Sequence, residues 1–326
     1  MLFQQFLENF HSQGYYSACV VFCECFIMLI EEKGRYVDPY FSFTRQQWKR
    51  LASSQSVDLN EVDLARLSGV NEVVSLPEIV EVYLPLSHLI RLHIDQARRL
   101  HSDVCHYLNN DEPKVPYIIG VAGSVASGKS TTSRVLQELL SSDHGLKVKV
   151  VGTDGFLFPN AVLESKGLMG RKGFPDSYNL DALLRFLFDL KAGKEGLAVP
   201  VYSHHLYDIL PDQPDEIGSV DVVILEGLNI LQTGASTVEQ QRVFVSDFLD
   251  FTVFVDAPVE YVKRWYIDRV VAFSQGPMRD PDAYFHTLST LSESAVTEYA
   301  ATVWNEINAV NLVENILPFR YRARCV

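Results

Sequence analysis

Hydrophobic residues recur with a helical period through much of the first third of the chain. Ser75, Pro77 and Glu78 fit a capping box with proline in the first turn, which predicts the start of a helix. Pro85 should kink or divide this helix, because proline lacks the backbone N–H that a helix interior needs. Apolar residues with a spacing near 3.6, which place one face of the helix in the protein core, are Ile79, Val82, Leu86, Leu89, Ile90, Ile94, Ala97 and Leu100.

After a polar break at 109–113 the pattern changes to short β-branched runs that alternate with helical segments. The predicted strands are 115–122, 146–152, 220–225 and 251–255, and the predicted helices are 131–140 and 179–191. Alternation of this kind predicts an α/β fold with a mostly parallel sheet and helices on both faces. Ligands of such sheets bind beyond the carboxyl ends of the strands, so the residues that follow each strand are the candidates for function.

A phosphate-binding loop follows the first of these strands. Its residues are Gly123, Ser124, Val125, Ala126, Ser127, Gly128, Lys129 and Ser130, with Thr131 continuing into the predicted helix. They satisfy the pattern G-x-x-x-x-G-K-[ST] between a strand and a helix, the context in which backbone N–H groups can surround phosphates. Lys129 can reach the β and γ oxygens of a nucleotide, and the Ser130 hydroxyl can ligate Mg²⁺.

Two acidic residues follow the next predicted strands. Asp154 comes directly after 146–152, where it would face the phosphate loop and could accept a hydroxyl proton or hold a metal ion. Glu226 ends the third strand and competes for the metal role. Either carboxylate could instead only cap a neighbouring helix or loop.

Composition and charge exclude several classes of partner. Lys and Arg number 28 against 41 for Asp and Glu, so the formal net charge is −13 and a general nucleic-acid or anionic-membrane binder is disfavoured. Five cysteines without a Cys-x-x-Cys pair indicate a reduced, cytoplasmic chain. The apolar run Gly14–Ile30 is shorter than the roughly 20 residues of a membrane span and contains Glu24, so we favour an extra helix, a tail or an overlong start over a membrane anchor.

The motifs favour a small-molecule phosphotransferase over a GTPase. The guanine-binding motif Asn-Lys-x-Asp is absent from the sequence. Aromatic and polar clusters at 201–207 and 265–269 could supply an acceptor site, although each cluster alone would also fit ordinary packing or a solvated helix face. A solvated basic loop explains Lys166, Arg171 and Lys172 at least as well as a mobile flap over the site does.

Taken together, the motifs resemble the bacterial type I pantothenate kinase family over roughly residues 38–324. They include GSVASGKS, VGTDGFLFPN, MGRKGFPDSYN, VYSHHLYDI, ILEGLNIL, WYIDR and DPDAYFH, with FTRQQW, GVNE and EVYLPLS in the N-terminal helical region. Uridine kinase and phosphoribulokinase share the phosphate loop and the Asp-Gly-Phe segment but lack the N-terminal region, WYIDR and AYFH. They are the alternatives within the enzyme class.

The resemblance implies ATP-dependent phosphorylation of pantothenate with Mg²⁺, feedback inhibition by coenzyme A at the ATP site, and a homodimer. It makes Asp154 the catalytic base, places Arg134 on the helix after the phosphate loop and Asn71 against the adenine, and assigns phosphate and magnesium to Lys129 and Ser130. Arg269 would add positive charge near the transferred phosphoryl group. The pantothenate site would comprise Tyr202, His204, Tyr207, Tyr266, Arg269 and Asn308, with an aromatic wall of Phe273, Tyr284 and Phe285.

We therefore expect an atypical extension at 1–37, a helical region at 38–112 and a kinase core at 113–326. Compared with the family pattern, the chain stops at Cys325-Val326, before the last strand and a tail with an adenine-stacking histidine. This difference keeps a second class open, that of a catalytically weak nucleotide sensor. The phosphate loop and the acceptor residues favour the enzyme.

Overall fold

A parallel four-stranded sheet forms the centre of the protein. The computed structural model describes residues 18–22, 40–52, 61–68, 74–110, 114–142, 144–233 and 243–326. The sheet contains β3 (Tyr117–Gly123), β4 (Val148–Gly152), β7 (Val222–Gly227) and β8 (Phe251–Val255) in the order β4-β7-β3-β8. All three strand pairs are parallel, so the four carboxyl ends lie along one edge.

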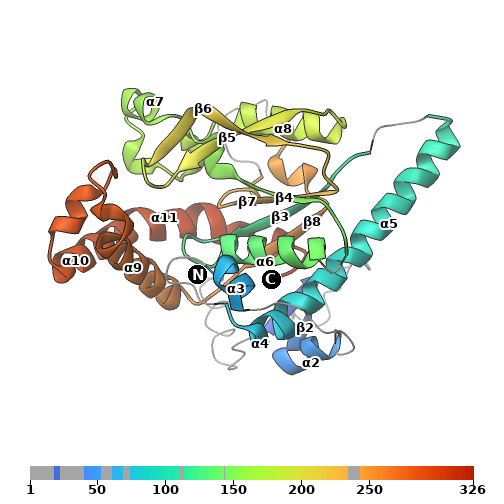
Figure 1. Cartoon of the computed structure of the whole chain (residues 1–326), viewed down its shortest axis with the longest axis horizontal. Helices are drawn as coiled ribbons and strands as arrows, with labels where there is room; N and C mark the ends of the chain where they lie inside the picture. Colours follow the sequence, from blue (N-terminus) through green and yellow to red (C-terminus); the bar gives the residue numbers. More distant parts are fainter. Residues whose placement is uncertain are drawn as a thin grey trace, which may run out of the picture.

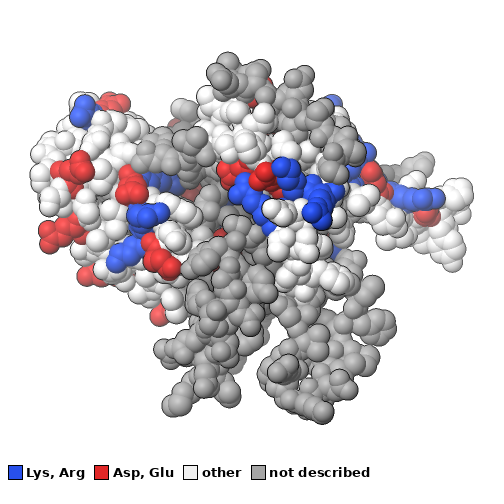
Figure 2. Space-filling view, turned by 90° about the horizontal axis from the view of Figure 1, so that it is seen from below, with Lys and Arg blue, Asp and Glu red and all other residues white. Residues whose placement is uncertain are grey.

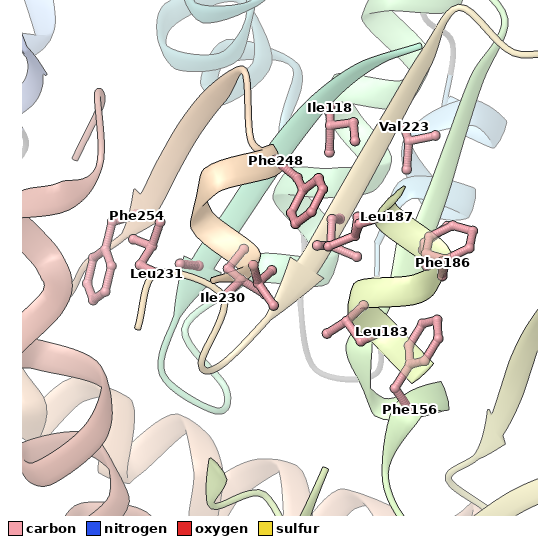
Figure 3. Close-up of a cluster of buried hydrophobic side chains, with 14 of the residues drawn as sticks. Ile118, Phe156, Leu183, Phe186, Leu187, Val223, Ile230, Leu231, Phe248 and Phe254 are labelled. Atoms are coloured by element: carbon pink, nitrogen blue, oxygen red, sulfur yellow. The ribbon is translucent and has the colours of Figure 1, made fainter. Parts of the chain in front are cut away.

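Alternate residues of these strands pack into different cores, one on each face of the sheet. Figure 1 shows α8 on one side of the sheet and α6 on the other. On one face Ile119 packs with residues of α5 (Leu84–Leu108) and α6 (Lys129–Ser142). On the other, Ile118 and Val223 pack with α8 (Leu180–Lys191), whose Leu187 is fully buried (Figure 3). Successive side chains of a strand point to opposite faces, so a continuous apolar run is what a sheet covered on both sides requires. The predicted fold class is confirmed.

The predicted strands and helices of the core are all present. Strand β8 has the predicted bounds, and the others differ by one to two residues at their ends. The long N-terminal helix is divided as expected, because α4 (Leu76–Glu78) continues through a π-helical turn, η1 (Ile79–Tyr83), into α5 just before Pro85. A π turn lets the helix accommodate the missing N–H of proline.

Two strand pairs were not predicted. The region from Tyr40 was expected to be helical, but β2 (Tyr40–Thr44) is a strand that pairs with β1 (Ala18–Phe22) before α2 (Arg45–Arg50) and α3 (Glu61–Leu67). β5 (Leu197–Ser203) and β6 (Asp208–Ile217) form an antiparallel hairpin beside the main sheet. The rest of the expected extension at 1–37 lies outside the described residues.

Short helices at the carboxyl edge of the sheet and a helical C-terminal region complete the fold. They are η2 (Thr153–Phe156), α7 (Asn160–Ser165), η3 (Met169–Arg171), η4 (Pro175–Ser177), η5 (Val245–Phe248), α9 (Val259–Gln275), η6 (Pro277–Arg279), η7 (His286–Thr290), α10 (Glu293–Val303), η8 (Trp304–Asn308), α11 (Ala309–Asn311), η9 (Leu312–Ile316) and η10 (Leu317–Arg322). The last residues return to the sheet, where Cys325 forms a parallel bridge with Val253 of β8.

Acidic and basic side chains are mixed on the surface. Figure 2 shows Lys and Arg next to Asp and Glu over the described part of one face. An example of such mixing is Glu81 of η1, which pairs with both Arg45 and Lys49 of α2. Within the described residues, no helix is both long and apolar enough to cross a membrane.

Candidate active site

The phosphate loop joins β3 to α6, and its backbone adopts conformations at Gly123 and Gly128 that favour glycine. Gly123 has a φ of +146°, and a Cβ atom there would lie 2.6 Å from the carbonyl oxygen of Val255. Gly128 has a φ of +93°, in the region that L residues with side chains rarely adopt. The Lys129 ammonium donates a 2.6 Å hydrogen bond to the Ser124 carbonyl oxygen, so its charge is held at the loop itself.

Two oxygen-bearing side chains meet at the ends of neighbouring elements beside the loop. The Ser130 hydroxyl at the start of α6 donates a 3.0 Å hydrogen bond to Glu226 Oε1 at the end of β7. The other carboxylate oxygen, Glu226 Oε2, is buried and has no hydrogen-bond partner within the described residues. A hard cation such as Mg²⁺ prefers oxygen ligands and keeps several waters and phosphate oxygens, so this pair fits the predicted metal site.

Asp154 lies in η2, directly after β4, where a hydrogen bond orients its carboxylate and close packing fixes the backbone next to it. The buried Tyr178 hydroxyl donates a 3.2 Å hydrogen bond to Asp154 Oδ1. Burial and the Asp154 carboxylate raise the pKa of Tyr178 well above its usual value, so Tyr178 remains a neutral donor at physiological pH. Next in sequence, Gly155 packs so closely on β5 that a Cβ atom would lie 2.1 Å from the Pro200 carbonyl oxygen.

A cavity of about 560 Å³ connects the phosphate loop with the predicted acceptor residues. Of the predicted site residues it is lined by Val125, Ala126, Gly128, Lys129, Ser130, Asp154, Tyr202, His204, Tyr207, Glu226, Tyr266, Arg269, Phe273, Phe285 and Asn308. The structure therefore brings the loop, the acids after the strands and most of the acceptor residues into one space. The roles of these residues stay predictions.

The hairpin β5–β6 supplies the polar aromatic wall of the cavity. The rings of Tyr202 and His204 lie 5.2 Å apart, and Tyr207 packs edge-on against Phe285 at 4.8 Å. Burial raises the pKa of both tyrosines, so their hydroxyl groups stay protonated. Burial also lowers the pKa of His204, which favours a neutral imidazole at pH 7.

Helix α9 and the π turn η8 supply the opposite wall. Tyr266 and Arg269 are about one helical turn apart on α9, so both reach the cavity from one face of that helix. Asn308 in η8 forms a side-chain hydrogen bond with Tyr266. The Arg269 guanidinium lies 5.3 Å from the centre of the Phe273 ring.

Several predicted residues do not line the cavity. Tyr284 is 49% exposed and packs with its ring 5.1 Å from that of Tyr207, on the outer side of the aromatic wall. Arg134 donates to the Leu67 carbonyl oxygen and to the Thr131 hydroxyl, so it braces α6 against α3. Asn71 lies outside the described residues. The remaining loop residues that do not line the cavity are Gly123, Ser124, Ser127 and Thr131.

The three basic residues between Asp154 and the hairpin separate in the structure. Lys172 lines the cavity, whereas Lys166 lies over the Phe158 ring and Arg171 pairs with Asp176. From the sequence, both a mobile flap and a solvated basic loop remained possible interpretations for all three residues. Their residue type and spacing contain no signal that distinguishes Lys172 from the other two.

Other residues of the cavity were not predicted. Tyr178 contacts Asp154 although it comes from a different segment, and it occurs in the run MGRKGFPDSYN that also contains Lys172. Asn311 lines the cavity and donates its side-chain N–H to the Gly173 carbonyl oxygen. Family-like runs were the only available signals for both residues: MGRKGFPDSYN contains Tyr178, and the run WNEIN..NL..NILP at 304–318 contains Asn311.

The chain is similar in sequence to a known kinase family and to known pantothenate kinases. Residues 118–272 match the phosphoribulokinase / uridine kinase family. The chain is also 51% identical to the pantothenate kinase of Coxiella burnetii over 302 residues, which cover 92% of this chain and 95% of that protein. The pantothenate kinase of Klebsiella pneumoniae is 47% identical over 299 residues, 91% of this chain and 94% of that protein.

A solved structure with partial likeness is the D-glycerate 3-kinase of Cryptococcus neoformans. It has 16% sequence identity and a TM-score of 0.46, over 66% of this chain and 88% of that protein. At that TM-score the likeness adds no weight to the assignment. The fold assignment rests on the parallel sheet and phosphate loop described above, and the family assignment on the curated relatives.

Proposed function

The chain belongs to the pantothenate kinase family, and on this premise we propose that it transfers the γ-phosphoryl group of ATP to the hydroxyl group of pantothenate. The product would be 4′-phosphopantothenate, in the first step of coenzyme A biosynthesis. The observation that carries this proposal is a single cavity that is lined by the phosphate loop, by Asp154 and by the polar aromatic residues of the β5–β6 hairpin.

Asp154 is the general base that we propose for activation of the acceptor hydroxyl group. The acceptor oxygen attacks the γ-phosphorus, its proton passes to the Asp154 carboxylate, and the bond between the γ-phosphorus and the bridging oxygen breaks to release ADP. Oδ1 accepts the hydrogen bond from Tyr178, so we assign the acceptor proton to Oδ2. Phosphoryl transfer depends mainly on positioning and charge neutralisation, so a carboxylate oriented by the Tyr178 hydrogen bond is well suited to it.

Three cationic side chains line the same cavity and can neutralise the transferred phosphoryl group. Lys129 approaches from the phosphate loop, Arg269 from α9, and Lys172 from the segment before Tyr178. When bound, Mg²⁺ would be held by Ser130 and Glu226 and would neutralise charge on the β- and γ-phosphates.

The pocket beyond Asp154 matches the chemistry of pantothenate. Pantothenate has a carboxylate, an amide and an apolar dimethyl stem. Protonated tyrosine hydroxyl groups, a neutral imidazole and the Asn308 amide can hydrogen-bond its polar groups, and Phe273 and Phe285 can cover the stem.

Competition among acceptors tests the proposed function. With the full-length chain, ATP and Mg²⁺, pantothenate should be phosphorylated with a kcat/KM at least about 100-fold above that of uridine, ribulose 5-phosphate or pantetheine, because the pocket's polar groups would be left unpaired by the wrong acceptor. A coupled assay of ADP release, with each acceptor alone and in pairs, measures the ratios.

The same assay separates the alternatives. Faster phosphorylation of uridine or ribulose 5-phosphate would place the chain with the related kinases that share the phosphate loop. ATP binding without phosphorylation of any acceptor at saturating nucleotide would instead support the nucleotide sensor. Among the described residues Glu226 Oε2 is buried and has no hydrogen-bond partner, which favours the enzyme because this carboxylate oxygen is available to a catalytic cation.

We also propose feedback inhibition by coenzyme A that competes with ATP. Coenzyme A shares the pantothenate unit and an adenine nucleotide, and the cavity spans both the phosphate loop and an aromatic wall that could cover its thiol arm. Added coenzyme A should therefore raise the apparent KM for ATP and leave kcat unchanged. Initial rates over a grid of ATP and coenzyme A concentrations measure this, and inhibition insensitive to ATP would contradict it.

A cytoplasmic homodimer is the proposed form of the protein. Helix α5 projects beyond the sheet at its carboxyl end (Figure 1) and has exposed apolar side chains that a second copy could cover. They are Leu92, Leu100, Val104, Tyr107 and Leu108. Sedimentation equilibrium measures the assembled mass, and cell fractionation measures the location.

A further inference from the structure

The Lys172 ammonium group lies in a closely fitted site at the acceptor end of the cavity. Its Nζ donates hydrogen bonds of 2.6 Å to Asn160 Oδ1 and 2.5 Å to the Tyr207 carbonyl oxygen. The same atom lies 3.9 Å from the centre of the Tyr207 ring and 5.0 Å from that of Tyr202. All four contacts are with neutral groups, so none of them neutralises the positive charge of Lys172.

Asn160 is held rigidly enough to direct its side-chain oxygen. It is the first residue of α7, and its backbone N–H donates to Asp208 Oδ1 at 3.0 Å. Its side-chain Nδ2 donates to the Tyr207 carbonyl oxygen at 3.0 Å, which leaves Oδ1 facing Lys172. Asn160, Lys172 and the Tyr207 carbonyl therefore form a closed triangle of hydrogen bonds across three segments.

The backbone of Tyr207 is in an unusual conformation that completes this triangle. Tyr207 ends the turn between β5 and β6 with a φ of +54°, a left-handed value that residues other than glycine seldom adopt. In this conformation its carbonyl accepts from both Lys172 and Asn160. Strained residues of this kind cluster at binding and catalytic sites, where the surrounding contacts hold them in place.

The surroundings of Lys172 set its protonation. Burial lowers the pKa of Lys172 to about 8, and the Asp208 and Asp154 carboxylates act in the opposite direction. The rings of Tyr202 and Tyr207 face the ammonium group, and the Lys172 charge contributes to the lowered pKa of His204, which lines the same cavity. Lys172 is therefore a cation at pH 7 and loses its charge as pH rises through about 8.

We propose that Asn160 is a positioning residue, which holds the Lys172 ammonium against the Tyr207 carbonyl so that its charge meets the phosphoryl group during transfer. This inference rests on the proposed function. Asn160 touches neither the phosphate loop nor Asp154 in any described hydrogen bond, so it acts through Lys172.

Two substitutions of opposite character test this role. Asn160→Leu removes an acceptor of the ammonium, and Asn160→Asp places a carboxylate there. In wild type, kcat/KM for pantothenate should fall as pH rises through about 8. That alkaline limb should move to lower pH by about half a unit in Asn160→Leu and to higher pH in Asn160→Asp. At pH 7 we expect kcat in Asn160→Leu to fall about tenfold, with KM for ATP unchanged.

Lys172 itself provides the reference, and Lys166 the matched control. Lys172→Arg retains a positive charge that does not titrate, so its profile should have no limb near pH 8. Lys166→Met removes a cation from the same basic segment outside the cavity and should match wild type. Thermal melts by circular dichroism establish that each variant is folded, and Asn160→Ser replaces any Asn160 variant that is not.

A second readout does not depend on turnover. Acetic anhydride acetylates the unprotonated amine, so the labelling rate of Lys172 against pH, followed by mass spectrometry, reports its pKa directly. Opposite shifts in Asn160→Leu and Asn160→Asp would support the proposal even if pantothenate were not the acceptor. Shifts in the same direction, or wild-type kinetics together with unchanged labelling, would overturn it. If the labelling shows these opposite pKa shifts but pantothenate is not phosphorylated, the result would contradict the proposed function and not the role of Asn160.

Discussion

Replacing Asp154 with asparagine is expected to lower kcat by about 100- to 10,000-fold with little change in ATP affinity. An amide cannot accept the acceptor proton, so the transition state loses its general base. The substitution retains the side-chain volume, and the asparagine side-chain oxygen can still accept from Tyr178. Gly155, whose close packing on Pro200 holds this turn, is unchanged. The defect should therefore be chemical.

Single-turnover kinetics and ATP titration calorimetry measure the two quantities for Asp154→Asn separately. Asp176→Asn is a suitable control, because that carboxylate pairs with Arg171 nearby but does not line the cavity. It should retain wild-type kcat. A near-normal kcat in Asp154→Asn would mean that another group takes the proton, and Asp154 would then have to be reassigned to positioning or metal binding.

Replacing Lys129 with methionine should weaken ATP binding and lower kcat by about 100- to 1,000-fold. The ammonium group sits 2.6 Å from the Ser124 carbonyl oxygen, where it can move onto the β- and γ-phosphates of a bound nucleotide. Methionine retains most of the apolar stem but no charge, so developing negative charge on the phosphoryl group loses a partner.

For Lys129→Met, calorimetric titration with ATP and steady-state kinetics give the two effects. Lys149→Met is the matched control, because Lys149 lies on β4 and pairs with Asp215 of the hairpin, and it does not line the cavity. It should bind ATP normally. Unchanged affinity and unchanged turnover in Lys129→Met together would be incompatible with a functional phosphate loop.

Elements that depend on residues close together in the chain were predicted correctly, whereas elements that depend on contacts between distant segments were not. The strand 251–255 was predicted at its observed bounds, and the helix after the phosphate loop was predicted within two residues at each end. Apolar runs, helical periods and glycine turns are encoded by residues close together in the chain. Asp154 and Glu226 could be proposed because parallel strands must end along one edge.

The hairpin and the N-terminal strand pair were not recovered. The β5–β6 segment is interrupted by Pro200, has a register shift between Val199 and Val201, and contains Pro211 and Pro214. These features obscure the strict alternation that would predict a strand. β2 is only five residues long and gains its partner, β1, from a part of the chain 18 residues or more upstream.

The sequence alone determined the parallel α/β core, the phosphate loop and the acids that follow the strands. The tertiary structure alone decided which other groups reach the reaction. It separated Lys172 from Lys166 and Arg171, and it brought Tyr178 to Asp154 and Asn160 to Lys172. These choices depend on contacts between segments 12 to 35 residues apart, such as the bond from Lys172 to the left-handed turn at Tyr207, and no local pattern specifies them.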